Sequence, residues 1–143
     1  GPEAARERRL AIEELLEENR FQPLSAPGGR APPAGPYRLT LSLAHGRLVF
    51  ALATADGAPA GEFHLSLTPF RQVLRDYFQI VEAHHDAVRT LPPAKIEAID
   101  MGRRGIHDEG ARLLAERLEG KADIDMATAR RLFTLICALA PDI

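Results

Sequence analysis

Eleven consecutive residues hold the chain's densest set of groups that can do chemistry. Residues 100–110, DMGRRGIHDEG, combine two adjacent arginines, a histidine, three acids and three glycines. Each glycine inside a helix costs about 1 kcal/mol relative to alanine. Three of them in a segment with helical spacing therefore need a reason: a close backbone approach, a break in the helix or a ligand. We favour a break at Gly102–Gly105.

An arginine pair at such a break could hold an anion. Backbone N–H groups freed there, together with a helix N-terminus near His107, would bind phosphate or carboxylate, and Arg103 and Arg104 would add forked donors. No Lys-Ser/Thr pair follows and no hydrophobic strand precedes, so this is not a phosphate-loop pattern. The alternative is that the two arginines form ion pairs within the chain, with Asp100, Asp108 or Glu109.

The histidines suggest two further hypotheses, a metal site and an acid–base enzyme. A metal site needs three or four convergent ligands, and His84 and His85 diverge by about 100° if they lie on a helix. We therefore predict no metal. An enzyme could use His107 with Glu109 or Asp100. No nucleophile stands in a recognised pattern, however, so an acid–base enzyme is the third of our functional hypotheses.

A second basic pair, Arg130–Arg131, suggests a nucleic-acid surface together with four arginines upstream of it. From Lys95 to Arg131, however, eight cations face eight acids, and the whole chain has a net charge of −2. Phe133, two residues beyond this range, is the sole aromatic residue near it, and it lies in an apolar run that we expect to be buried. Nucleic acid is thus a conceivable partner but not the favoured one.

Composition places the chain among globular, single-domain proteins, with 45% hydrophobic residues over 143 positions. The single cysteine, Cys137, rules out an intramolecular disulfide and is expected to be a buried thiol. No apolar run approaches the length of a membrane span, so we expect no membrane partner and a cytoplasmic location. Gly1-Pro2 resembles the scar of a protease cleavage.

The N-terminal third divides into a helix and a loop. Residues 3–20 fit a charged amphipathic helix with the stripe Ala5, Ile12, Leu15 and Leu16, ending near Phe21. Residues 22–36 are rich in Pro, Gly and Ala, which is typical of a linker or an extended loop. The predicted organisation is a helix over 1–21, this linker, and one domain over 37–143.

Residues 37–67 predict a three-stranded antiparallel meander. Hydrophobic side chains alternate over 37–43, 47–53 and 62–67, and His45-Gly46 and Asp56-Gly57 provide the turns. Such a sheet needs helices to cover one of its faces.

The C-terminal half predicts three or four helices. One opens at Thr68-Pro69 and runs to Leu91, with the best apolar stripe of the chain: Phe70, Val73, Tyr77, Val81, His84, Val88 and Leu91. Residues 94–120 keep a helical phase, so they form either one long helix or two helices that flank a break at Gly102 to Gly105, and we favour two helices. Asp125 should cap a last helix over 126–140, ended by Pro141. The fold class is therefore α+β.

Several strings also resemble one protein family: SLTPFR (66–71), IEAIDMGRRG (96–105), HDEG (107–110) and TARRLFTLIC (128–137). They are similar to the small alphaproteobacterial proteins of the uncharacterised protein family UPF0262, from about Leu10 to Leu139. The resemblance implies a bacterial cytosolic protein and implies no activity, cofactor or active site. Relative to that family, the Pro-rich tract is longer than usual.

These observations favour a small non-enzymatic binding or regulatory protein without a cofactor. It would act through a protein partner or as a homodimer, and the N-terminal helix could pack in trans. The second reading is an anion binder for phosphate, nucleotide or RNA at Gly102–Gly105. The expected binding residues are Asp100, Arg103, Arg104, His107, Asp108, Glu109, Arg130 and Arg131.

Overall fold

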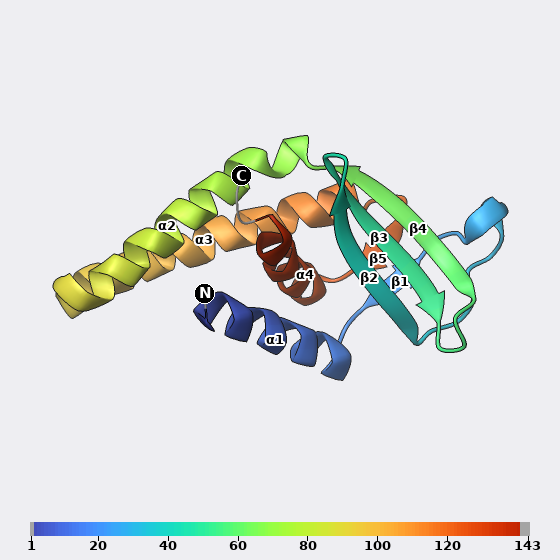
Figure 1. Ribbon diagram of the computed structural model, residues 1–143, viewed down its shortest axis with the longest axis horizontal. Coiled ribbons are helices and arrows are strands. Elements are labelled where there is room, and N and C mark those ends of the chain that lie inside the picture. The colour runs from blue at the N-terminus through green and yellow to red at the C-terminus, as the bar shows by residue number, and fades with distance from the viewer. Residues whose placement is uncertain (1, 141–143) are drawn as a thin grey trace.

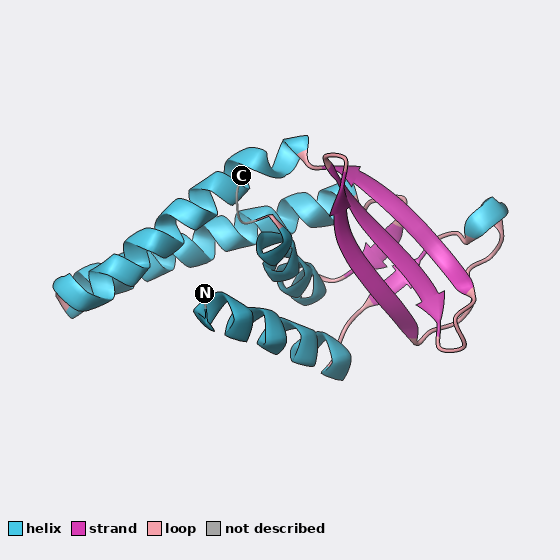
Figure 2. Cartoon of the chain, in the orientation of Figure 1, coloured by secondary structure: helices cyan, strands magenta, loops and turns pink. Residues whose placement is uncertain are grey.

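A computed structural model describes residues 2–140, so Gly1 and Pro141 lie outside the described residues. The helices are α1 (Pro2–Glu17), α2 (Arg71–Thr90), α3 (Pro93–Arg117) and α4 (Met126–Leu139). The strands are β1 (Phe21–Pro23), β2 (Tyr37–Ala44), β3 (Arg47–Thr54), β4 (Pro59–Ser66) and β5 (Ala122–Ile124). This arrangement confirms the α+β class, with the helices gathered to one side of the main sheet (Figure 2).

The predicted meander is confirmed as the sheet β2–β3–β4, antiparallel throughout. Its register pairs apolar residues across strands, for example Leu41 with Phe50 and Phe50 with Phe63. Leu48, Phe50 and Leu65 are buried, while the alternate residues Glu62 and His64 are exposed. Period-two alternation therefore turns one face of the sheet toward the helices.

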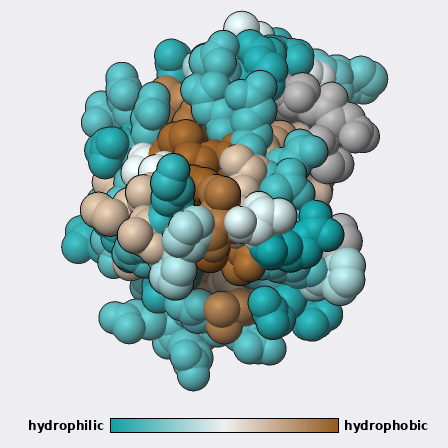
Figure 3. Space-filling view, turned by 90° about the vertical axis from the view of Figure 1, so that its left-hand side faces the viewer, coloured by the Kyte–Doolittle hydropathy of each residue, from teal (hydrophilic) through white to brown (hydrophobic). Residues whose placement is uncertain are grey.

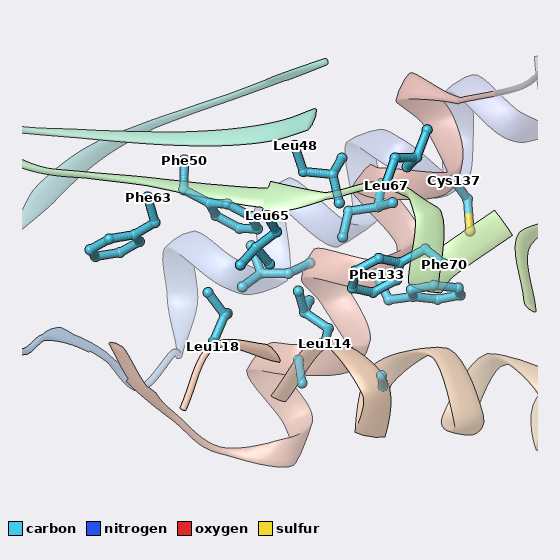
Figure 4. Packing of buried hydrophobic residues seen from close by; sticks show 14 of the residues in the cluster. Leu48, Phe50, Phe63, Leu65, Leu67, Phe70, Leu114, Leu118, Phe133 and Cys137 are labelled. Atoms are coloured by element: carbon cyan, nitrogen blue, oxygen red, sulfur yellow. The ribbon is translucent and has the colours of Figure 1, made fainter. Parts of the chain in front are cut away.

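The core forms where α3 and α4 meet that face. Phe133 of α4 and Leu114 of α3 lie below Leu65 and Leu67 (Figure 4). Cys137 belongs to this cluster, as predicted, and burial raises the pKa of its thiol well above the ordinary range. Asp125 caps α4 as expected, because its carboxylate accepts a hydrogen bond from the Thr128 N–H at 2.9 Å.

A second, two-stranded sheet was not predicted. β1 pairs antiparallel with β5, with Phe21 opposite Ile124, and Pro23 is fully buried. The start of the 22–36 tract is therefore part of the fold, and the prediction of a loop from residue 22 was wrong there. α1 ends at Glu17, a few residues before the expected end, and this sheet holds its connection to the domain.

The predicted break at Gly102–Gly105 was wrong, because α3 is one continuous helix of 25 residues. No helix begins near His107, so the anion site of freed N–H groups does not form. Two of the three glycines serve close packing instead. A Cβ on Gly102 would lie 2.8 Å from Ile80 Cδ1, and one on Gly110 would penetrate the Phe133 ring. Gly105 faces open space.

α2 and α3 form a long hairpin that projects away from the sheet (Figure 1). Residues 68–70 form a 3-10 turn, so α2 begins at Arg71 rather than at Thr68-Pro69. The outer part of the predicted stripe is not buried: Val81, Val88 and Leu91 are exposed. The hairpin end faces the viewer in Figure 3, where a band of hydrophobic side chains runs between hydrophilic ones. Within residues 2–140, no helix combines the length and the apolar character needed to cross a membrane.

Candidate functional site

A cleft of about 520 Å³ lies between α1, α3 and α4 and collects most of the predicted site. Six of the eight predicted residues line it: Arg103, Arg104, His107 and Asp108 from α3, and Arg130 and Arg131 from α4. α3 contributes its residues at steps of three and four, which share one face of a helix. The opposite wall is α1, which supplies Glu7 and Glu14, and α2 supplies Tyr77.

The other two predicted residues stand outside this lining. Asp100 lies one turn before Arg103 and Arg104 and contacts both, so it supports the cleft from outside. Glu109 is exposed on α3 and does not face the cleft with His107. The structure therefore separates His107 from Glu109, which was one of the two partners offered by the acid–base hypothesis.

Each arginine of the cleft forms an ion pair with a carboxylate of the chain. Such internal ion pairs were the alternative to the anion-site hypothesis. Arg103 Nη2 lies 2.8 Å from Asp100 Oδ1, and Arg104 Nη2 lies 3.2 Å from Asp100 Oδ2. The hydrogen bond from Arg103 is the main reason that the pKa of Asp100 is lowered. Arg104 also contacts Glu97, Arg130 contacts Asp108, and Arg131 contacts Glu14.

These ion pairs orient the guanidinium groups without using all their donors. Arg104 reaches its two carboxylates through Nη2, and Arg130 reaches Asp108 through Nε at 2.8 Å. A guanidinium carries five N–H donors, so each of these side chains keeps donors for a further acceptor. The side chains of Arg104 and Arg130 are also about half exposed, which leaves them accessible from solvent.

His107 sits at the inner end of the cleft, half-buried between two aromatic rings. Its ring centroid lies 5.4 Å from that of Tyr77 and 5.2 Å from that of Phe133. Nε2 lies 2.9 Å from the Thr134 hydroxyl, which donates its own hydrogen to the Arg130 carbonyl at 3.2 Å. This geometry favours the tautomer that carries the imidazole hydrogen on Nε2.

The charge state of the inner cleft follows from burial. Burial lowers the pKa of His107; Asp108 opposes this shift, and Arg103 and Arg130 add to it. Burial likewise raises the pKa of Tyr77 to about 12, although the adjacent Arg103 acts in the opposite direction. At neutral pH both side chains are uncharged, so the arginines are the only cations among residues 2–140 that line this cleft.

The described residues offer few groups for covalent or metal chemistry. Across residues 2–140, no group of three His, Cys, Asp or Glu side chains is placed to hold a metal ion. His84 Nε2 makes one contact with Asp100 Oδ1 at 3.8 Å, while His85 is exposed. The thiol of Cys137 is buried. The guanidinium groups of Arg104 and Arg130, which keep unused donors, could hold an anion in this cleft.

Sequence reasoning missed the contributions of Glu7, Glu14, Tyr77 and Thr134. Glu14 is one of several glutamates on a charged helix, and nothing near it in the sequence indicates that it meets Arg131, 117 positions away. Tyr77 stood on the apolar stripe of α2 and was assigned to the core, where it also packs.

The low pKa of His107 predicts a loss of stability in mild acid. An unfolded histidine titrates near pH 6.5, and the folded protein favours the neutral imidazole. The neutral His107 therefore makes its full contribution to the free energy of unfolding above about pH 6.5. This contribution is lost as the pH falls through the lower pKa that His107 has in the folded protein. Urea denaturation at pH 7 and pH 5 should show this loss in the wild type.

The matched variant is His107→Gln, whose amide can still donate to Thr134. Its free energy of unfolding should fall less between pH 7 and pH 5 than that of the wild type. The pKa values of Asp100 and Asp125 are lowered from an ordinary value that is already below pH 5. These two carboxylates therefore do not titrate between pH 5 and pH 7 and do not affect the comparison. Equal pH dependence in the two proteins would contradict the assignment of a neutral His107.

Comparison with known proteins identifies several relatives of this chain. Residues 1–141 match the model described as "Uncharacterised protein family (UPF0262)". A UPF0262 protein of Cereibacter sphaeroides is 63% identical over 96% of this chain and 86% of its own length. Those of Jannaschia sp. and Paracoccus denitrificans are 64% and 60% identical, over 96% and 99% of this chain and 86% of their own lengths. No solved structure matches the chain.

Proposed function

The chain belongs to the uncharacterised protein family UPF0262, and we propose that it is a non-enzymatic binding protein for a small anionic ligand. The ligand carries a phosphate or carboxylate group and occupies the cleft between α1, α3 and α4. The observation that supports this most directly is the convergence of four arginines from two helices on one recess.

A recess favours a small ligand over a protein partner. Small-molecule sites are concave and combine apolar walls with a few oriented polar groups. Here the apolar wall comes from Leu10, Ala11 and Ala127, and the oriented donors are the guanidinium groups. Arginine suits this role because its planar fork matches carboxylate and phosphate oxygens in pairs. The protein-partner hypothesis placed recognition on the segment 100–110 of α3, whereas Arg103, Arg104 and His107 of that segment line this recess.

The chain's own carboxylates set the strength of binding. Asp108 and Glu14 each pair with an arginine of the cleft, so their negative charges oppose an anion that binds the remaining donors. The Arg130–Asp108 pair is about half exposed, and such pairs contribute only about 0–1 kcal/mol. The ligand's affinity should therefore depend on salt and should rise when a competing carboxylate is neutralised.

The experiment measures thermal stabilisation and calorimetric binding with pyrophosphate as the probe, beside inorganic phosphate and citrate. A ligand present at 100 times its dissociation constant stabilises the folded state by about 2.7 kcal/mol. The variants Arg104→Gln and Arg130→Gln should each weaken binding by about 10-fold. Asp108→Asn should strengthen it, because Arg130 then has no competing carboxylate.

Arg112→Gln is the matched control, because Arg112 is exposed on α3 and does not line the cleft. It should leave pyrophosphate binding unchanged. Two results would overturn the proposal. One is no stabilisation by any of the three anions at 10 mM, on the order of the weakest useful affinities; the other is equal weakening by Arg112→Gln and Arg130→Gln.

A further inference from the structure

α1 presents a face to solvent that the rest of the chain does not cover. Its one buried residue is Ala11. Ile12 and Leu16, one turn apart, are exposed, and the exposed fraction of Leu16 is 81%. A helix this poorly buried gains little stability from its own domain, because most helical stability in proteins comes from packing of an apolar face.

An apolar groove runs beside this face. It has a volume of about 620 Å³ and lies between α1, β1, β2 and α4. Ile12, Leu15 and Leu16 form its α1 side, and Phe21, Leu39 and Leu135 are among the residues that complete it. The groove lies on the side of α1 that carries Ile12 and Leu16, so one occupant could cover both.

The charges of α1 indicate which partner could cover its exposed face and the groove beside it. Its basic residues are all in the first half of the helix, at Arg6, Arg8 and Arg9, where Glu3 and Glu7 offset part of their charge. The second half carries only acids, at Glu13, Glu14 and Glu17, and Glu18 follows directly. A second α1 laid antiparallel would set the three arginines of each copy against the acidic half of the other, whereas a parallel one would set the two acidic halves together. Opposite charges placed in this way fix both the partner and its orientation.

From this juxtaposition we propose that two copies of the chain associate through antiparallel α1 helices. Ile12 and Leu16 of each copy pack against the other copy beside the groove. Arg8 and Arg9 face Glu13 and Glu17 of the second copy. All four charged residues are exposed, and none has an ion-pair partner among residues 2–140.

The test reverses the charges of one half at a time. The double variants are Arg8→Glu/Arg9→Glu and Glu13→Arg/Glu17→Arg, studied by sedimentation equilibrium. The wild type should have twice the 15.7 kDa mass of one chain. Each double variant should raise the dimer dissociation constant by at least about 100-fold. An equimolar mixture of the two variants should restore a dimer, because each then meets a complementary helix.

Neither reversal should unfold α1, since Arg and Glu have similar and high helix propensities. Circular dichroism checks this directly. A wild type that stays monomeric up to about 1 mM would overturn the proposal. A dimer that survives both reversals would also overturn it, by placing the interface elsewhere. The anion site is not involved, because none of the four substituted residues lines the cleft.

Discussion

Gly110→Ala is expected to lower the free energy of unfolding by about 3 kcal/mol, near the upper end for overpacking a core. The added methyl group would fall on the Phe133 ring, and both residues are buried. Neither side can yield easily, because Gly110 is in the middle of α3 and Phe133 is fully buried on α4. Urea denaturation followed by circular dichroism measures the change.

The same helix supplies two controls for this variant. Gly105→Ala adds a methyl group in open space and should raise the free energy of unfolding by about 0.5–1 kcal/mol, through helix propensity alone. Gly102→Ala meets only the far end of the Ile80 side chain, which can rotate, so its effect should be near zero. Equal effects of the three substitutions would refute the view that packing explains these glycines.

The three glycines show what a sequence can and cannot reveal about α3. Their low helix propensity was read correctly as a signal that needs a cause. The cause was misassigned, because a glycine that admits a neighbouring side chain and one that breaks a helix look alike in sequence. Phe133 and Ile80 lie 23 and 22 positions from the glycines they contact, and only the tertiary structure brings them together.

Local patterns were sufficient wherever neighbouring residues set the structure. The alternation in residues 37–67 predicted the meander, and Asp125 predicted the start of α4. The β1–β5 pair has no such signal, because three-residue strands are too short for a pattern and Pro23 argues against one. These strands form because residues 21–23 and 122–124 meet at the edge of the core.

Only the part of the candidate site that lies on one helix could be predicted from the sequence. Arg103, Arg104 and His107 share a helix face, and sequence spacing alone groups them. Arg130 and Arg131 were included as a second basic pair, although nothing in the sequence placed them opposite α3. The α1 wall could not be anticipated, since Glu14 meets Arg131 only through the packing of α1 on α4.

Phe133→Ala should be the most destabilising single substitution considered, by about 3–5 kcal/mol. Phe133 is fully buried, fills the space above Gly110, and packs edge-on against Tyr77 and His107. Loss of the ring leaves a cavity between α3 and α4. It also admits water to His107, so the pKa of that histidine should return toward its ordinary value, which NMR titration can follow.

The decisive measurement combines this substitution with Gly110→Ala. If the glycine exists to admit the ring, then Gly110→Ala should cost much less once the ring is gone, because the methyl group enters the cavity. The double variant should be more stable than the sum of the single effects by about 1–3 kcal/mol, the range for residues in direct contact. Additive effects would mean that Gly110 is required for a reason other than Phe133. Since both variants are strongly destabilised, the cycle is best measured in a stabilised background such as Gly105→Ala.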